Sequence, residues 1–152
     1  MRPNIMLDLT TTGGSMAKKA VAFSEEKFKC FVRYMIQAAK QKRCVAYVEL
    51  ENVFGLGHGQ VGWYAGVLGD YCISRNLPRL NGLIINSTNC VPSEGFEWYQ
   101  QQCGKSWGEI VSECWQAFHV TSTRLKQSQD FSKRDSDVAE YLSSKPIPSY
   151  QA

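Results

Sequence analysis

The stretch from Tyr47 to Asn86 constrains the fold most, because it contains two helical patterns separated by a short turn that carries glycine. The first pattern ends at Gly55, where the end of a helix favours a residue that accepts a positive φ. The second pattern begins at Gly59, repeats apolar residues every three and four positions, and ends at Asn76 before Pro78. Helix, short turn and helix in this order predict a helix-turn-helix unit.

A short apolar run follows this unit. Residues 83–85 predict a brief buried strand, and residues 87–95 are rich in turn formers. Residues 96–99 then provide either the return strand of a hairpin or the start of an irregular loop. We therefore expect an α+β fold, a small single domain with a winged-helix-like helix-turn-helix centre, a short strand or hairpin and flanking amphipathic helices.

Two flanking helices have recognisable N-termini. Ser24 precedes two glutamates and is a suitable N-cap for a helix that we expect to lie over the core as a lid. Ser106 and Glu109 form the Ser-x-x-Glu pattern of a capping box, followed by an amphipathic stretch that extends to Phe118. The apolar stripe of the first helix consists of Phe28, Phe31, Val32, Met35, Ile36 and Ala39.

The length of 152 residues suits one domain. Residues 1–22 contain a linker-like run of threonine, glycine and serine, which predicts a flexible N-terminal extension. We expect residues 23–120 to form the globular domain. Residues 121–152 are mostly polar and predict a C-terminal tail, with a short helical pattern at 136–142.

The six cysteines do not show the paired spacing of a zinc site or a redox motif. The sequence also shows no recognisable signal peptide and no apolar run long enough to span a bilayer. We therefore expect six free thiols in a cytoplasmic protein, and we assign no metal and no cofactor.

The formal charge of +3 is small, but its distribution is uneven. Basic residues gather in the N-terminal third, including Lys40, Lys42 and Arg43, and again after residue 120, whereas the segment between 45 and 76 has few charges. Basic flanks around a nearly uncharged centre suit a phosphate backbone, although solvated helix faces are the commoner origin of such a pattern.

The second central helix is unusually rich in small residues. Gly62, Gly66 and Gly69 lie mostly on one side of it, and each glycine costs about 1 kcal/mol of helix stability relative to alanine. Such a face indicates that something packs close to the backbone, either another element of the domain or a nucleic-acid groove. For reading bases in the major groove, the helix offers only Gln60 and Arg75.

Three parts of this region resemble the winged-helix half of DNA alkyltransferases and alkyltransferase-like proteins: the run Tyr47–Leu56, the sequence Gly59-Gln60-Val61-Gly62, and the Pro-led sequence 77–81 before an apolar strand. In that family a helix of small residues enters the minor groove. Here the residues after Pro78 include no alkyl-accepting cysteine, and Gln60 stands where the family has an intercalating arginine. The resemblance therefore implies a DNA-binding shape without the repair chemistry.

Residues with catalytic potential are scattered. Cys90 follows the predicted strand but has no histidine or acid tied to it by a motif. Asp70, Glu94 and Glu97 supply carboxylates for a nuclease-like metal site, but the expected Glu-x-Lys pattern is missing.

We therefore expect a non-catalytic protein that binds nucleic acid, with DNA as the expected form. The alternative is a small phage or mobile-element protein that binds and inhibits a host protein, for which Trp63 and Trp98 are candidate anchors. An enzyme that depends on a cysteine or a metal is the third hypothesis. The residues expected to contact nucleic acid are Tyr47, Gly59, Gln60, Gly62, Trp63, Gly66, Arg79, Lys40, Lys42 and Arg43.

Overall fold

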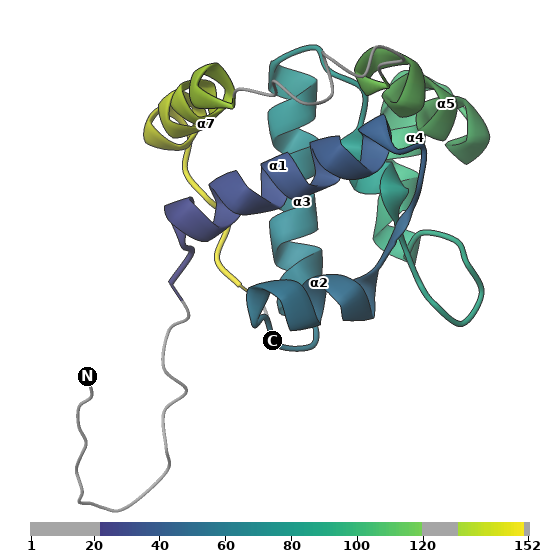
Figure 1. Ribbon diagram of the computed structural model, residues 1–152, viewed down its shortest axis with the longest axis horizontal. Helices are drawn as coiled ribbons and strands as arrows, with labels where there is room; N and C mark the ends of the chain where they lie inside the picture. Colours follow the sequence, from purple (N-terminus) through teal and green to yellow (C-terminus); the bar gives the residue numbers. More distant parts are fainter. Residues whose placement is uncertain (1–21, 120–130, 151–152) are drawn as a thin grey trace, which may run out of the picture.

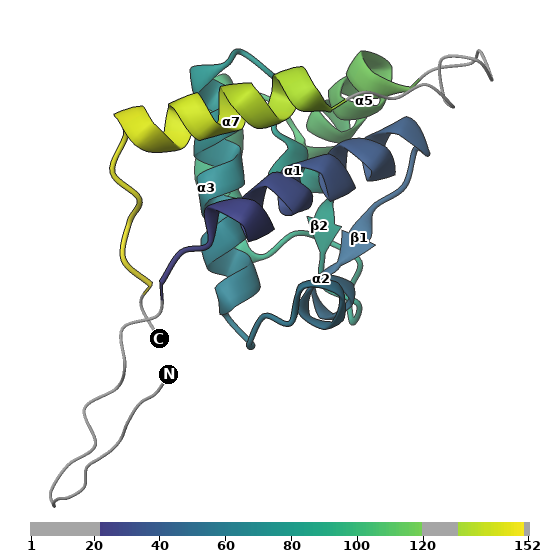
Figure 2. The same ribbon diagram turned by 60° about the vertical axis from the view of Figure 1, so that its left-hand side comes forward.

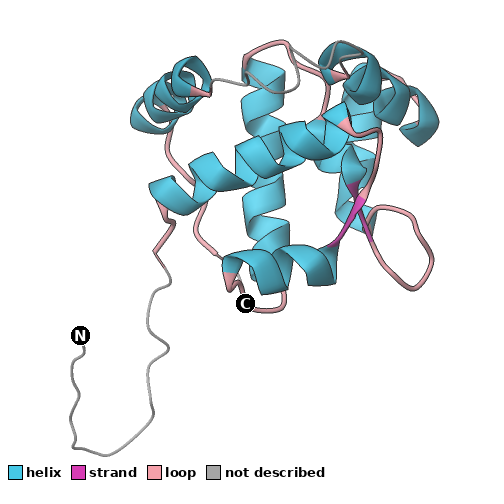
Figure 3. Cartoon of the chain, viewed as in Figure 1, coloured by secondary structure: helices cyan, strands magenta, loops and turns pink. Residues whose placement is uncertain are grey.

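Helices form most of the fold in the computed structural model, which describes residues 22–119 and 131–150 (Figures 1 and 3). The helices are α1 (Glu25–Lys40), α2 (Tyr47–Phe54), α3 (Gln60–Ser74), α4 (Glu97–Cys103), α5 (Trp107–Phe118) and α7 (Ser132–Ser144). The strands β1 (Val45–Ala46) and β2 (Ile84–Ile85) and the short 3-10 helices η1 (Leu80–Leu83) and η2 (Glu94–Phe96) complete the description. Among the described residues, no helix is long and apolar enough to cross a membrane.

Helix α1 lies at the centre of the fold, which corrects its expected position as a lid. Ser24 caps it by accepting a hydrogen bond from the backbone N–H of Lys27, as predicted. The whole predicted stripe is buried, and so is Ala38 beside it. Because this widens the apolar surface of the helix, α1 packs against α3, α5, α7 and η1 (Figure 2).

The helix-turn-helix order of α2 and α3 is confirmed. Helix α2 ends at Gly55, which has a φ of 63°, and Gly59 precedes α3 with a φ of 94°. Between them the side chain of Leu56 is buried in the core. The predicted apolar residues of α3 are also buried, which fixes this helix along its length: Val61, Tyr64, Leu68, Tyr71 and Cys72.

Of the two expected alternatives, a short strand or a hairpin, the structure contains the strand, at Ile84–Ile85, and not the hairpin. Strands β1 and β2 pair in parallel, with Val45 opposite Ile84 and Ala46 opposite Ile85. The expected return strand at residues 96–99 instead begins α4, because Phe96 and Tyr99 are spaced to bury on one side of a helix. The described residues therefore form a mostly helical small domain with one two-stranded parallel sheet.

Helix α7 corrects the expectation of a polar tail over residues 121–152. Its Val138 and Tyr141 are buried, and Asp137 accepts hydrogen bonds from Tyr71 and, at 2.7 Å, from Nε of Arg75. Two apolar residues among many charges gave a weak helical pattern in the sequence, whereas these polar contacts depend on the folded neighbours. The expected extension at 1–22 lies outside the described residues except for its last residue.

The glycines of α3 fall into two environments. A Cβ at Gly69 would lie 2.5 Å from a ring carbon of Tyr99 and 2.6 Å from Nδ2 of Asn81. A Cβ at Gly66 would meet only the Tyr99 hydroxyl, at 4.0 Å, and one at Gly62 would meet nothing within 4 Å. The close packing that the sequence indicated therefore occurs at Gly69, against α4 of the same domain.

Alanine substitutions at Gly66 and Gly69 should separate helix propensity from close packing. We expect Gly66→Ala to raise the free energy of unfolding by about 0.5–1 kcal/mol, because a helix interior favours alanine over glycine. We expect Gly69→Ala to lower it by about 1–3 kcal/mol, because Tyr99 or Asn81 must move. Urea denaturation measures both changes. Stabilisation at both positions would contradict the placement of Gly69 in the core.

The carboxylate of Asp137 should make the docking of α7 sensitive to acid. Partial burial acts to raise the pKa of Asp137, but the hydrogen bonds from Tyr71 and Arg75 outweigh it and lower the pKa below its ordinary value. The ionised group therefore stabilises the fold above the unfolded pKa of about 3.9. That stabilisation is lost as the pH falls through the lower folded pKa.

The variant Asp137→Asn tests this contribution. At pH 7 we expect it to lower the free energy of unfolding by about 1–3 kcal/mol, and its stability should fall less than that of the unaltered protein below about pH 4. Glu140→Gln is the control, because Glu140 also pairs with Arg75 but its side chain is 75% exposed. The control should change stability by less than about 0.5 kcal/mol. Denaturant titrations at several pH values measure both variants.

Candidate nucleic-acid interface

Eight of the ten residues expected to contact nucleic acid lie in two separate places, while Tyr47 begins α2 and Arg79 precedes η1. Five of them belong to the N-terminal part of α3 or precede it, at the end of the molecule beside the C-terminus (Figures 1 and 2). Lys40, Lys42 and Arg43 lie at the C-terminal end of α1, close to α5. The small-residue helix and the basic cluster therefore do not form one continuous surface.

Several residues of the α3 group are already engaged within the chain. The side-chain oxygen of Gln60 accepts a hydrogen bond from the backbone N–H of Gly57 at 2.7 Å. Trp63 donates to the carbonyl of Pro148, and a Cβ at Gly59 would lie 3.0 Å from the hydroxyl of Tyr150. Gly62 and Gly66 remain open but offer no side chain. In α2, Tyr47 donates its hydroxyl proton to Ser93.

The basic turn after α1 contains one cation that is available to a ligand. Arg43 pairs with Glu49 at 2.9 Å, and this contact is the main reason why the pKa of Glu49 is lowered. Lys40 is largely buried, and its backbone carbonyl lies 2.8 Å from Nδ1 of His119. Lys42 adopts a φ of 53° and is exposed, and none of the described carboxylates pairs with it. Lys42 is therefore the member of this turn that faces solvent with its charge free.

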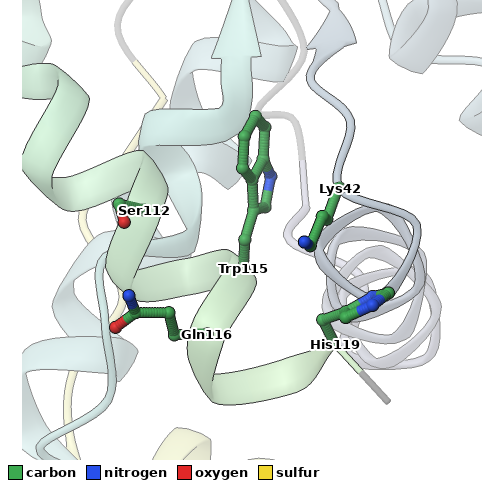
Figure 4. Close-up of a pocket in the computed structure, with 5 residues that line it drawn as sticks. All are labelled: Lys42, Ser112, Trp115, Gln116 and His119. Atoms are coloured by element: carbon green, nitrogen blue, oxygen red, sulfur yellow. The ribbon is translucent and has the colours of Figure 1, made fainter. Parts of the chain in front are cut away.

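Lys42 lines a surface pocket of about 300 Å³ together with one side of α5 (Figure 4). The other lining residues are Ser112, Trp115, Gln116 and His119, spaced three or four positions apart on or just after α5. In Figure 4 the edge of the Trp115 ring that carries nitrogen is turned toward the side on which Lys42 lies. That nitrogen, Nε1, is buried and has no hydrogen-bond acceptor. One residue of the pocket wall, Trp115, thus has a buried N–H donor without a partner.

A second surface pocket, of about 420 Å³, lies next to the first, because Gln116 lines both. Arg79 and Lys105 bring positive charge to it, although Lys105 pairs with Glu113. The Nε atom of Arg79 is buried without an acceptor, like the indole nitrogen of Trp115. We call the combined surface the α5 face; its donor-bearing residues are Lys42, Arg79, Lys105, Trp115, Gln116 and His119.

Net charge does not distinguish this face from the rest of the molecule. Five of the 17 Lys and Arg residues and two of the 14 Asp and Glu residues lie outside the described residues, so the described part is balanced in these charges. Many of its cations are paired, among them Lys29, Arg33 and Arg75. What distinguishes the α5 face is that two of its residues, Arg79 and Trp115, have buried N–H donors without acceptors.

The structure brings together two of the predicted contacts, Lys42 and Arg79, across α5. Sequence reasoning missed Lys105, Trp115, Gln116 and His119 as members of the same surface. The spacing of the α5 residues was a usable signal, because positions three and four apart share one face of a helix.

The residues considered for catalysis do not form a cluster. Asp70 accepts a long hydrogen bond, 3.3 Å, from the hydroxyl of Tyr99. Across residues 22–119 and 131–150, no group of three His, Cys, Asp or Glu side chains is placed to hold a metal ion. Cys90 is exposed in a turn and has a φ of 60°.

Comparison of the chain with protein-family models, curated proteins and solved structures found no match in any of the three. Inferences about its function therefore rest on the geometry of this chain.

The six cysteines should differ in reactivity according to their burial. Burial raises the pKa of Cys72 to about 12 and also raises that of Cys114, so neither forms a thiolate near neutral pH. Cys30 and Cys90 are exposed. We expect iodoacetamide at pH 8 to modify Cys30 and Cys90 in the folded protein and Cys72 and Cys114 only after denaturation, as followed by peptide mass spectrometry. Thiol counting under denaturation should find six free thiols, because none of the cysteines forms a disulfide in the structure. A smaller number would contradict this.

Proposed function

We propose that this protein binds nucleic acid through the α5 face and carries out no catalysis there. The observation that supports the proposal is that Arg79 and Trp115, which line neighbouring pockets, each have a buried N–H donor without an acceptor, Nε and Nε1 respectively. A buried donor that is left unsatisfied costs about 1–3 kcal/mol, so a ligand rich in acceptor oxygens gains if the side chains of Arg79 and Trp115 turn these donors toward it.

A nucleic acid matches the chemistry of this surface. Phosphate oxygens accept charge-assisted hydrogen bonds from Arg and Lys, and most protein contacts to nucleic acid are of this kind. Lys42 and Arg79 supply the charges at the two pockets, while Gln116 supplies both a donor and an acceptor between them. Because phosphate contacts carry no sequence information, the expected binding is largely independent of sequence.

The order of α2 and α3 agrees with a helix-turn-helix protein, which supports DNA as the nucleic acid to test first. The same order is compatible with the proposed relationship to the winged-helix half of DNA alkyltransferases, although this chain lacks their acceptor cysteine. The proposed binding surface differs from the one that the resemblance implies, the small-residue helix α3. The N-terminal end of α3 is covered by Pro148 and Tyr150 of the same chain, which contact Trp63. A cytoplasmic location remains part of the same proposal.

A protein partner is the second candidate, as expected for a small protein that inhibits a host factor. The observation that favours it is the exposure of large apolar side chains on α2 and α4: Val48 and Val53 are each 50% exposed and Trp98 is 49% exposed. The balanced charge of the described residues also suits a protein surface.

Removal of the two available charges on the α5 face tests the leading proposal. The double variant Lys42→Gln, Arg79→Gln should weaken binding to duplex DNA at low salt, by similar factors for unrelated sequences. It should also reduce the slope of log K against log salt by about 2, because two phosphate contacts are lost. Fluorescence anisotropy of labelled duplexes at several salt concentrations measures both quantities.

The matched control is Lys27→Gln, Lys133→Gln, which removes the same charge from α1 and α7 away from the α5 face. If the control weakens binding as much as the test variant, the surface is assigned wrongly. If the unaltered protein binds neither duplex nor single-stranded nucleic acid at low salt, nucleic-acid binding is rejected and the protein partner becomes the leading candidate.

A further inference from the structure

One cation of the α5 face, Lys105, is held by a carboxylate of the same face. Nζ of Lys105 forms an ion pair with Oε2 of Glu113, and both residues line the larger pocket beside Arg79. Among the described residues that line the two pockets, Glu113 is the only acid. The negative charge of this face therefore lies on a cation that would otherwise be available to a phosphate.

The backbone of Lys105 is fixed on both sides, which leaves its side chain as the movable part. Gly104 ends α4 with a φ of 67°, and the backbone N–H of Lys105 donates to the carbonyl of Gln100 at 3.3 Å. Ser106 then begins the capping box of α5. Because a lysine side chain is a flexible four-carbon stem, its ammonium group can exchange one oxygen acceptor for another while the fold stays unchanged.

The exposure of both partners makes this ion pair easy to open. The side chains of Lys105 and Glu113 are 41% and 39% exposed. Water therefore screens their attraction, and ion pairs of this kind contribute little to the stability of a fold. When the pair opens, water solvates the Glu113 carboxylate, so no buried charge is left without a partner. The pair holds Lys105 at rest without preventing it from binding another anion.

Arg79 lies within electrostatic range of Lys105. The hydrogen bond with Glu113 is the main reason why the pKa of Lys105 is raised, and the positive charge of Arg79 acts in the opposite direction. The Nε atom of Arg79 is itself buried without an acceptor. A phosphate that enters the larger pocket therefore meets both cations, and it competes with Glu113 for Lys105.

We propose that Lys105 is a further phosphate contact of the α5 face and that Glu113 controls it, because an incoming phosphodiester takes the place of the Glu113 carboxylate on Lys105. This inference rests on the proposed binding of nucleic acid by the same face. The exchange breaks one charge-assisted hydrogen bond and forms another. Its driving force is the release of counterions from the nucleic acid.

The exchange also selects for a polymer of phosphates. A nucleic acid that is already bound by Lys42 and Arg79 holds its next phosphate near Lys105 at a high effective concentration. A free phosphate ion has no such advantage, and it must displace the Glu113 carboxylate by its own affinity alone. Glu113 therefore acts against small anions more strongly than against nucleic acid.

The first test compares the unaltered chain with the variants Glu113→Gln and Glu113→Gln, Lys105→Gln in anisotropy titrations of a labelled duplex at several salt concentrations. Glu113→Gln removes the competing charge and nearly keeps the side-chain shape, so we expect it to bind at least about threefold more tightly at low salt. The addition of Lys105→Gln should abolish this gain. It should also reduce the slope of log K against log salt by about 1 relative to Glu113→Gln, because one phosphate contact is lost.

The matched control is Glu26→Gln. Glu26 also pairs with a lysine, Lys29, but it lies in the first turn of α1, whereas the α5 face lies at the other end of that helix. The control should change the affinity by less than about twofold, because salt screens charges that are far from the ligand. A gain equal to that of Glu113→Gln would show a general effect of net charge and would overturn the proposal.

The second test locates the contact directly, by lysine acetylation of the unaltered chain followed by peptide mass spectrometry. The duplex should protect Lys42 and Lys105 from modification and leave Lys27 and Lys133 reactive. Inorganic phosphate at the same phosphate concentration should leave Lys105 as reactive as in the protein alone.

The outcomes separate this inference from the proposed function. Protection of Lys42 without protection of Lys105 overturns the role of Lys105 and leaves the α5 face as the binding surface. Equal protection of Lys105 by inorganic phosphate overturns the selection for a polymer. If neither the unaltered chain nor Glu113→Gln binds nucleic acid, the proposed function is rejected and this inference with it.

Discussion

The packing of the four-residue turn Leu80–Leu83 holds the domain together. Leu80 and Leu83 are fully buried, and the turn contacts α1, α3 and α5. Trp107 at the start of α5 donates its indole N–H to the carbonyl of Gly82 at 2.7 Å. A Cβ at Gly82 would lie 2.8 Å from the ring of Phe96 in η2 and 3.1 Å from Ile110 in α5, so only glycine allows these two elements to approach the turn so closely. Every element that lines the α5 face is positioned through this turn.

The elements with strong local signals were predictable from the sequence. Ser24 caps α1, Gly55 ends α2, and the Ser106 and Glu109 pair forms the predicted capping box of α5. Each of these signals acts within one turn of helix, so no knowledge of the tertiary fold is needed. The glycine spacing in α3 also indicated close packing correctly, but only the position of Tyr99 shows that Gly69 is the packed residue.

The elements that depend on distant neighbours were not predictable. The sequence of η1 reads as a loop, and its structure comes from the leucines that enter the core. Helix α7 buries two side chains, Val138 and Tyr141, in the core. It also relies on hydrogen bonds from Tyr71 and Arg75 to Asp137, and both donors lie more than 60 residues earlier in the chain. For the candidate site, the basic cluster after α1 pointed to Lys42, and the Pro-led sequence 77–81 contained Arg79. The contribution of Trp115 and Gln116 became visible only once the orientation of α5 was known, since burial decides which of their polar atoms lack partners.

The residues after 130 hold α3 at both of its ends by different kinds of contact. Helix α7 binds the C-terminal end of α3 through buried apolar side chains and a charged hydrogen-bond network. Residues 145–150, the C-terminal strap, contact the N-terminal end of α3 through the hydrogen bond from Trp63 to the carbonyl of Pro148 and the ring contact between Trp63 and Tyr150. Contacts that share no residues usually contribute to stability almost additively, so loss of the strap leaves the docking of α7 intact.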